Sequence, residues 1–383
     1  MDKCHLSHPV AACGPAKNLD ALYDLALSPS VPSFRTIESQ GKRYTVGTNP
    51  LGLKDGSIHI GLLDWLAGQY QSVAQELSHR YGSARIALLL GTCDFNAEWS
   101  TEMNRQLLKE GTYQEGYTLE LQEPGWSARY LARKLGLCGM ALTISTACSS
   151  SAVCVIRGRD LVESGACDAV IVAATDIAYP LVCQGFDSLG VYSPVPCKPF
   201  AKGRRGVTLS SSAAGVIVSR ERIADESCLL LGAGETNDAW HITSPDPEGR
   251  GAEKAMRKAL DEAGIHPGDV GYLNLHGTGT VQNDAMEAKA VSRLFGSRVP
   301  ASSTKSVTGH TLGSCGVLEL DLCMQVLRKG LLPPQRYLDE LDEGLEPLGF
   351  VEAGKTYAHP RYCLSNAFGF GGSNSALVIG GEA

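Results

Sequence analysis

The chain has 383 residues, of which 43% are hydrophobic and 20% charged, and its formal net charge is −7. These proportions are typical of a globular protein with a large core, and the negative charge argues against nucleic acid as the main partner. No apolar stretch approaches the roughly 18 to 20 residues that a membrane-spanning helix needs, so we expect no membrane insertion.

Thirteen cysteines are scattered at irregular spacing. Residues 1–30 lack the basic start and apolar stretch of a secretory signal peptide. Both features favour reduced thiols in a cytoplasmic protein. The sequence has no CxxC pair and no tight cluster of cysteine and histidine, so we predict no metal site.

Short apolar runs alternate with helical patterns through the first part of the chain. Buried strands are predicted to begin at Ala84, Met140, Asp168 and Ala213. Helices are predicted near residues 61–81, 125–135 and 150–164.

The same alternation follows in the second part. Strands are predicted to begin at Cys228, Val270, Arg361 and Ser375, with helices near 251–263, 284–295 and 313–328. Repetition of one pattern predicts two similar α/β halves, residues 1–225 and 226–383, that meet near residues 220–230 and share one core.

Cys148 lies in "TACSSS", between a predicted strand and a predicted helix. The free N–H groups and the positive dipole end of a helix N-terminus stabilise an anion, which favours a reactive thiolate. The serines at 149–151 suit the same helix start as caps. A small buried hydrophobic residue is the alternative interpretation, and Cys148 alone leaves both open.

Three further motifs follow in the second half. "LNLHGTGT" places His276 at the end of a strand, before a helix whose early residues include Asp284 and Glu287. "STKSVTGHTLGSCGVLEL" carries His310, with Lys305 five residues before it and Glu319 nine residues after it. "SNAFGFGGSN" is a glycine-rich turn suited to bringing backbone close to a ligand.

These four motifs, in this order and spacing, resemble those of the elongating β-ketoacyl-acyl-carrier-protein synthases of the thiolase-like superfamily. The resemblance runs from about residue 84 to the C-terminus. It implies a five-layered αβαβα fold of two pseudo-symmetric halves, a homodimer or a heterodimer with a related subunit, and acyl-carrier protein as partner. The implied reaction is decarboxylative Claisen condensation with malonyl-acyl-carrier protein, in fatty-acid, polyketide or aryl-polyene synthesis, without a cofactor of its own.

By this resemblance Cys148 matches the acyl-accepting nucleophile. His276 and His310 match the histidine pair that promotes decarboxylation and condensation. Phe370 matches a gating phenylalanine whose N–H joins that of Cys148 in an oxyanion hole. The chemistry requires such groups, because acyl transfer needs a soft nucleophile and an enolate needs N–H donors.

Lys305 matches a lysine that orders the site, and Glu319 matches a buried glutamate. The resemblance also implies four substrate-binding positions, Phe186, Thr278, Thr280 and Gly371.

Neighbouring families fit less well. Thiolases would carry a second cysteine in the C-terminal glycine-rich motif, and initiating or chalcone-type synthases would have asparagine in place of His310. A non-catalytic chain-length-factor-like subunit is the alternative function, but that class lacks the nucleophile. A cysteine protease would leave Lys305 and the glycine motifs unexplained, and "LGAGET" stops short of the GxGxxG of a nicotinamide enzyme.

Some segments depart from the family pattern. The usual N-terminal strand is hard to find, with "SHPVAACGPAKNL" in its place. "KPFAKGRRGVTLSSS" has serines 210–212 instead of an acidic, glycine-rich turn, and "GTCDFNAEWS" differs from the segment that shapes the acyl pocket. No basic docking segment is found near residues 111–119. Candidate docking charges are Arg129, Arg133, Lys202, Arg204 and Arg205.

Overall fold

The computed structural model describes residues 3–30, 32–47, 49–53 and 56–381. The first half contains β1 (Cys4–Cys13), α1 (Leu19–Leu27), β2 (Arg35–Ser39), β3 (Lys42–Val46), α2 (Ile58–Tyr81), β4 (Ile86–Gly91), α3 (Ala97–Glu110), α4 (Trp126–Lys134), β5 (Ala141–Ile144), α5 (Ser150–Glu163), β6 (Ala169–Asp176), α6 (Pro180–Ser188) and β7 (Ser212–Ser219). The second half contains β8 (Cys228–Asn237), α7 (Arg250–Ala263), β9 (Tyr272–Asn274), α8 (Val281–Phe295), β10 (Pro300–Ser302), α9 (Lys305–Thr308), α10 (Cys315–Lys329), β11 (Gly349–Phe350), β12 (Tyr362–Gly369) and β13 (Ser373–Gly380).

The two halves repeat one sheet topology. The strand order β5-β4-β6-β7-β1 of the first half corresponds to β10-β9-β12-β13-β8 of the second. Corresponding pairs also agree in direction: β4 with β6 and β9 with β12 are parallel, whereas β6 with β7 and β12 with β13 are antiparallel. A short antiparallel pairing of β1 with β8 joins the two sheets, so the predicted pseudo-symmetry is present.

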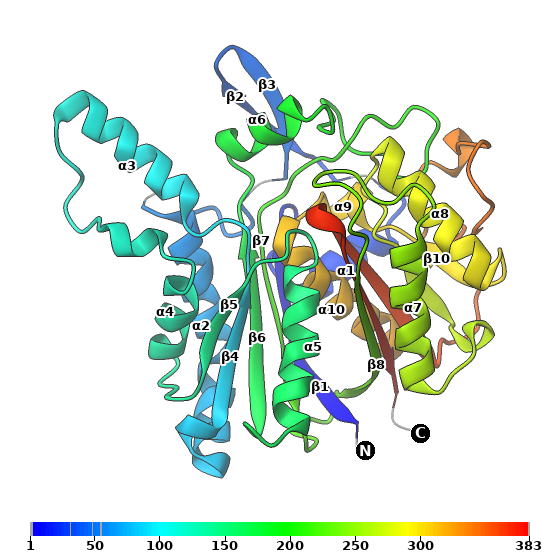
Figure 1. The fold of residues 1–383 in the computed structure, drawn as a ribbon, viewed down its shortest axis with the longest axis horizontal. Helices are drawn as coiled ribbons and strands as arrows, with labels where there is room; N and C mark the ends of the chain where they lie inside the picture. Colours follow the sequence, from blue (N-terminus) through cyan, green and yellow to red (C-terminus); the bar gives the residue numbers. More distant parts are fainter. Residues whose placement is uncertain (1–2, 31, 48, 54–55, 382–383) are drawn as a thin grey trace.

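Helices complete the layers on both faces of the sheets (Figure 1). Helices α2 and α4 pack on the outer face of the first sheet, and α7 and α8 on the outer face of the second. Helices α5 and α10 lie between the sheets and contact one another. The order helix, sheet, helix, sheet, helix is the five-layered αβαβα thiolase-like fold.

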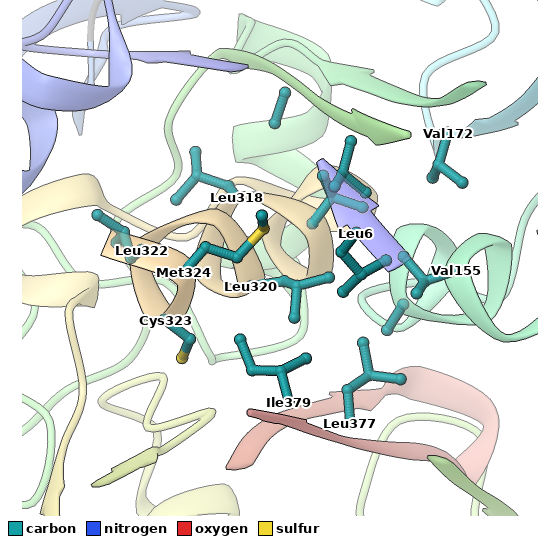
Figure 2. Close-up of a cluster of buried hydrophobic side chains, with 14 of the residues drawn as sticks. Leu6, Val155, Val172, Leu318, Leu320, Leu322, Cys323, Met324, Leu377 and Ile379 are labelled. Atoms are coloured by element: carbon teal, nitrogen blue, oxygen red, sulfur yellow. The ribbon is translucent and has the colours of Figure 1, made fainter. Parts of the chain in front are cut away.

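The central core encloses most of α5 and α10: every residue of Ser150–Ile156 and of Cys315–Val326 is buried. Figure 2 shows Leu320 of α10 and Val155 of α5 near Leu6, Leu377 and Ile379 from the strands. The two helices approach closely where a Cβ on Gly316 would lie 2.7 Å from the backbone nitrogen of Ala152.

The N-terminal strand is present, although its sequence looked incomplete. β1 pairs along its length with β7, but its register shifts between Ser7 and Val10, where His8 has φ 50° and Pro9 has no N–H. This irregularity breaks the usual strand pattern. In the part of the chain that the structure describes, no helix is both long and apolar enough to cross a bilayer.

Candidate active site

Cys148 lies in a tight turn between β5 and α5, as its motif predicts. Ala147 holds the turn in a left-handed conformation with φ 54°. The Ser149 hydroxyl donates to the carbonyl oxygen of Thr146 at 2.7 Å, and the Ser150 hydroxyl to that of Ala147 at 2.5 Å. Ser149 holds the predicted N-cap position of α5, but none of the serines 149–151 caps the helix with its side chain: those of Ser149 and Ser150 bind the turn that presents the sulfur, and that of Ser151 accepts the N–H of Val317.

The Cys148 thiol is buried, with 6% of the residue exposed. Burial raises the pKa of Cys148 to about 12, although the Lys305 ammonium and the N–H groups of Phe370 and Cys148 itself act to lower it. The resting group is thus a thiol, and burial outweighs the helix terminus that the sequence analysis relied on. The nearest base is His310, whose Nε2 lies 3.1 Å from Sγ.

Alkylation of Cys148 by iodoacetamide is expected to accelerate continuously as the pH increases past 9.0, the ordinary thiol pKa, because a raised pKa keeps the thiolate a minor form until higher pH. Brief labelling at a series of pH values, followed by peptide mass spectrometry, measures this rate beside that of the exposed Cys138. A Cys148 rate that reaches its plateau below pH 9.0 would contradict the effect of burial.

His276 follows β9 and is fixed by the second half. Glu287 of α8 accepts the N–H of His276 at 2.8 Å and that of Gly277 at 2.7 Å. Nζ of Lys305 lies 3.4 Å from Nδ1 of His276. An ammonium only donates hydrogen bonds, so Nδ1 accepts and the ring carries its proton on Nε2. Burial and the Lys305 charge hold the pKa of His276 well below its ordinary value, which keeps the ring neutral.

Lys305 and Glu319 form a fully buried ion pair between α9 and α10. Burial opposes the ammonium, but contact with Glu319 outweighs burial and raises the pKa of Lys305. The lysine is therefore a fixed positive charge beside His276.

His310 faces the nucleophile from a loop. This loop pairs with residues 206–212, which belong to the segment whose sequence differs from the family pattern. Its backbone N–H donates to the oxygen of Thr208 at 2.6 Å, and the N–H of Ser210 donates to the oxygen of His310 at 3.0 Å. The serines that replace the family's glycine-rich turn thus belong to the segment that supports this histidine. Burial and Lys305 lower the pKa of His310 well below its ordinary value.

The three side chains meet at one point. Sγ of Cys148 and one ring nitrogen each of His276 and His310 all lie within 4.8 Å of one another. The two rings stand edge to face, with centroids 5.4 Å apart. A thioester carbonyl bonded to Sγ would therefore lie within reach of two neutral imidazoles.

The glycine-rich turn closes the other side of the nucleophile. A Cβ on Gly369 would lie 2.7 Å from the oxygen of Thr146, so glycine is required for this approach. The backbone N–H groups of Phe370, the next residue, and of Cys148 itself act to lower the pKa of the Cys148 thiol, so both lie near the sulfur. Two converging backbone donors are the arrangement of an oxyanion hole.

Phe370 and Phe186 stack with centroids 5.7 Å apart and separate two cavities that both reach Cys148. We call one the histidine cavity; it is lined among others by His276, His310, Thr278, Thr280 and Asn374. The other, the aspartate cavity, is lined among others by Cys93, Asp94, Asp176, Tyr179 and Val182. The stacked rings are the boundary between them.

Gly371 lies outside the lining of both cavities, because its N–H donates to the oxygen of Ile242 at 2.8 Å and its oxygen accepts from Asn237. Its neighbour Gly372 lines the histidine cavity instead. Asp94 and Asp176, which line the aspartate cavity, were not predicted from the sequence. For Asp94 a signal was present in the departure of "GTCDFNAEWS" from the family pattern, whereas Asp176 ends the predicted strand "DAVIVAATD" without one.

Among the residues that the structure describes, two sets of side chains are close enough to share a metal ion: Cys148 with His276 and His310, and His276 with Cys315 and Glu319. In the second set the Lys305 ammonium already contacts His276 and Glu319, and it would repel a cation. The expected absence of a metal stays a prediction.

Arg204 cannot serve as a docking charge. Its side chain is 3% exposed and pairs with Asp342 and Asp284. The prediction of Arg204 as a docking charge was therefore wrong. The other candidates are exposed: Arg129, Arg133, Lys202 and Arg205.

The chain matches two family models, "Beta-ketoacyl synthase, N-terminal domain" over residues 74–224 and "Beta-ketoacyl synthase, C-terminal domain" over residues 227–339. Nodulation protein E of Rhizobium meliloti is 33% identical over 362 residues, which are 89% of each chain. The 3-oxoacyl-[acyl-carrier-protein] synthase 2 of Staphylococcus aureus is 31% identical over 77% of each chain. A solved ketosynthase from Xenorhabdus doucetiae, in complex with its chain length factor, is 34% identical with a TM-score of 0.90, covering 100% of this chain and 98% of that one.

Proposed function

Because the chain belongs to the β-ketoacyl synthase family, an acyltransferase class, we propose that it joins an acyl group held on Cys148 to malonyl-acyl-carrier protein by decarboxylative Claisen condensation. The observation that carries this proposal is the convergence of the Cys148 sulfur and two imidazole nitrogens within 4.8 Å, at the junction of two cavities.

In the first step Cys148 attacks an acyl thioester. The new bond forms between Sγ and the acyl carbon as the carbon–sulfur bond to the carrier's phosphopantetheine breaks. His310, 3.1 Å from Sγ, is placed to take the thiol proton and return it to the departing thiol. The N–H groups of Cys148 and Phe370 hold the charge that develops on the acyl oxygen.

In the second step the malonyl thioester occupies the histidine cavity. Loss of CO₂ leaves an enolate, whose oxygen accepts hydrogen bonds from Nε2 of His276 and from His310, once the neutral His310 ring has exchanged to the tautomer with its proton on Nε2. Because both rings are neutral, they stabilise this charge without readily protonating the nucleophilic carbon. The enolate carbon then attacks the acyl carbonyl, and Cys148 leaves as a thiolate that regains a proton.

This mechanism needs no cofactor of the protein's own, since both substrates arrive as carrier-bound thioesters. We place the protein in the cytoplasm, which the thirteen free cysteines favour because thiols stay reduced there. The intact nucleophile weighs against a non-catalytic chain-length-factor-like role.

We also propose that a related subunit pairs with β5. This strand ends the sheet, and Leu142 within it and Met140 just before it are each 47% exposed. An exposed apolar strand at the edge of a sheet has unpaired backbone N–H and C=O groups and can pair with a strand of another subunit. The Xenorhabdus doucetiae relative was solved with a chain length factor, which supports a specialised pathway such as polyketide or aryl-polyene synthesis. Light scattering tests this pairing, and a purely monomeric protein would contradict it.

The condensation is tested by incubating the protein with acyl-carrier and malonyl-carrier proteins, together with any partner subunit that co-purifies with it. We expect a 3-oxoacyl-carrier protein in the mass spectrum, and none with Cys148→Ala. Cys138→Ala is the matched control, because Cys138 is exposed. Equal product from Cys148→Ala would refute the proposed nucleophile.

A further inference from the structure

The aspartate cavity, of about 180 Å³, contains an acidic side chain that the proposed mechanism does not use. Asp94 lines the cavity together with Cys148, and its side chain is 1% exposed. An acyl group bound to Cys148 can enter this cavity, since the sulfur lies in its wall. Asp94 is therefore placed to meet such a group away from solvent.

One oxygen of Asp94 is occupied and the other is free. Oδ1 accepts the N–H of Ala97, at the start of α3, at 3.0 Å. Oδ2 has no hydrogen-bond partner among the described residues, and Nδ1 of His59 is too far away, at 3.7 Å. A buried carboxyl oxygen without a partner costs free energy, unless a ligand supplies the missing hydrogen bond.

The surroundings of Asp94 are polar on the side of α3. Asp176 lines the same cavity, and burial followed by the nearby Asp94 raises the pKa of Asp176 well above its ordinary value. Tyr179 lines the aspartate cavity and also a second hollow, together with Glu98 and Arg105 of α3. Tyr179 is thus the lining residue that the aspartate cavity shares with this second, more polar hollow.

We propose that Asp94 determines acyl specificity by accepting a hydrogen bond from a hydroxyl group near the far end of the acyl chain. A hydroxyl has one donor proton, which matches the one free oxygen of Asp94. Oδ2 of Asp176, in the same cavity, also lacks a partner, but burial holds the pKa of Asp176 well above its ordinary value and favours its neutral form, which is the weaker acceptor. An ammonium has three donors, and two of them would face the apolar walls formed by residues such as Ile177, Val182 and Leu312. This inference rests on the proposed acylation of Cys148.

The test compares thioesters of N-acetylcysteamine in pairs. Each pair contains an ω-hydroxyacyl group and the unsubstituted acyl group in which a methyl group replaces the hydroxyl. The hydroxyacyl groups range from butanoyl to decanoyl. The acylation rate of Cys148 is followed by intact-protein mass spectrometry. At one or more lengths we expect the wild-type protein to react about tenfold faster with the hydroxylated member, the effect of satisfying one buried hydrogen-bond acceptor.

Asp94→Leu should abolish or reverse this preference, and Asp94→Asn should weaken it. Asp94→Asn preserves the shape of the side chain, so it decides the outcome if Asp94→Leu fails to fold. Asp261→Leu, at an exposed position on α7, is the matched control and should keep the wild-type ratio.

A wild-type preference for the unsubstituted member at every length would overturn the proposal, as would an equal loss of both rates in the Asp94 variants. Failure of every thioester to acylate Cys148 would instead overturn the proposed function, and this inference with it. Equal acylation by both members of each pair would leave the proposed function standing and refute the role of Asp94 alone.

Discussion

His276→Ala and His310→Ala are each expected to lower CO₂ release from malonyl-carrier protein by about a hundredfold or more, because each removes one donor to the enolate oxygen. The measurement is the release of labelled CO₂, with acylation of Cys148 followed in parallel by mass spectrometry. His276→Ala should still be acylated, since its ring serves the enolate. His310→Ala should be acylated more slowly, because Nε2 of His310 is the base nearest to Sγ.

Two further variants serve as controls. His310→Asn keeps a side-chain N–H donor and should retain more decarboxylation than His310→Ala. His79→Ala changes an exposed residue near the end of α2 and should behave as the wild-type protein does. Normal CO₂ release from both His276→Ala and His310→Ala would remove the roles assigned to the pair.

Lys305→Met is expected to lower the free energy of unfolding by about 3–5 kcal/mol, because it leaves Glu319 buried without its cation. The same variant removes the donor to Nδ1 of His276, so condensation should be lost as well. Urea-induced unfolding followed by circular dichroism measures the first effect, and product formation measures the second.

The double variant Lys305→Met with Glu319→Leu separates stability from activity. It removes both buried charges, so most of the lost stability should return, whereas condensation should stay absent because His276 still lacks its donor. Lys254→Met, at an exposed position on α7, is the matched control. Recovery of activity along with stability would show that Lys305 acts only on folding.

Elements buried on all sides were the ones that sequence patterns predicted best. β4, β6 and β7 are buried at every position, so each appears as an unbroken apolar run. β1 was obscured by His8 and Pro9 at its register shift, which interrupt the apolar pattern. The helix α3 was missed because its few buried residues, Ser100 and Met103, leave almost no apolar stripe.

The site motifs predicted which residues lie near Cys148, but not their environment. Arg204 looked like a surface charge because its partners, Asp284 and Asp342, are far away in the chain. The helix start at Ser150 suggested a thiolate, yet the ionisation of Cys148 depends on how completely other segments enclose the sulfur. Both depend on tertiary packing, which local sequence patterns do not report.

The repeated topology has a consequence for how the reaction is divided between the halves. α5 and α10 occupy equivalent places in the two halves, after β5 and β10, and the segments before them carry Cys148 in one half and Lys305 with His310 in the other. In the proposed mechanism these equivalent segments have different tasks: the first carries the acceptor of the acyl chain, and the second carries groups that activate the malonyl thioester. Severed from its counterpart, neither copy would retain a complete reaction centre.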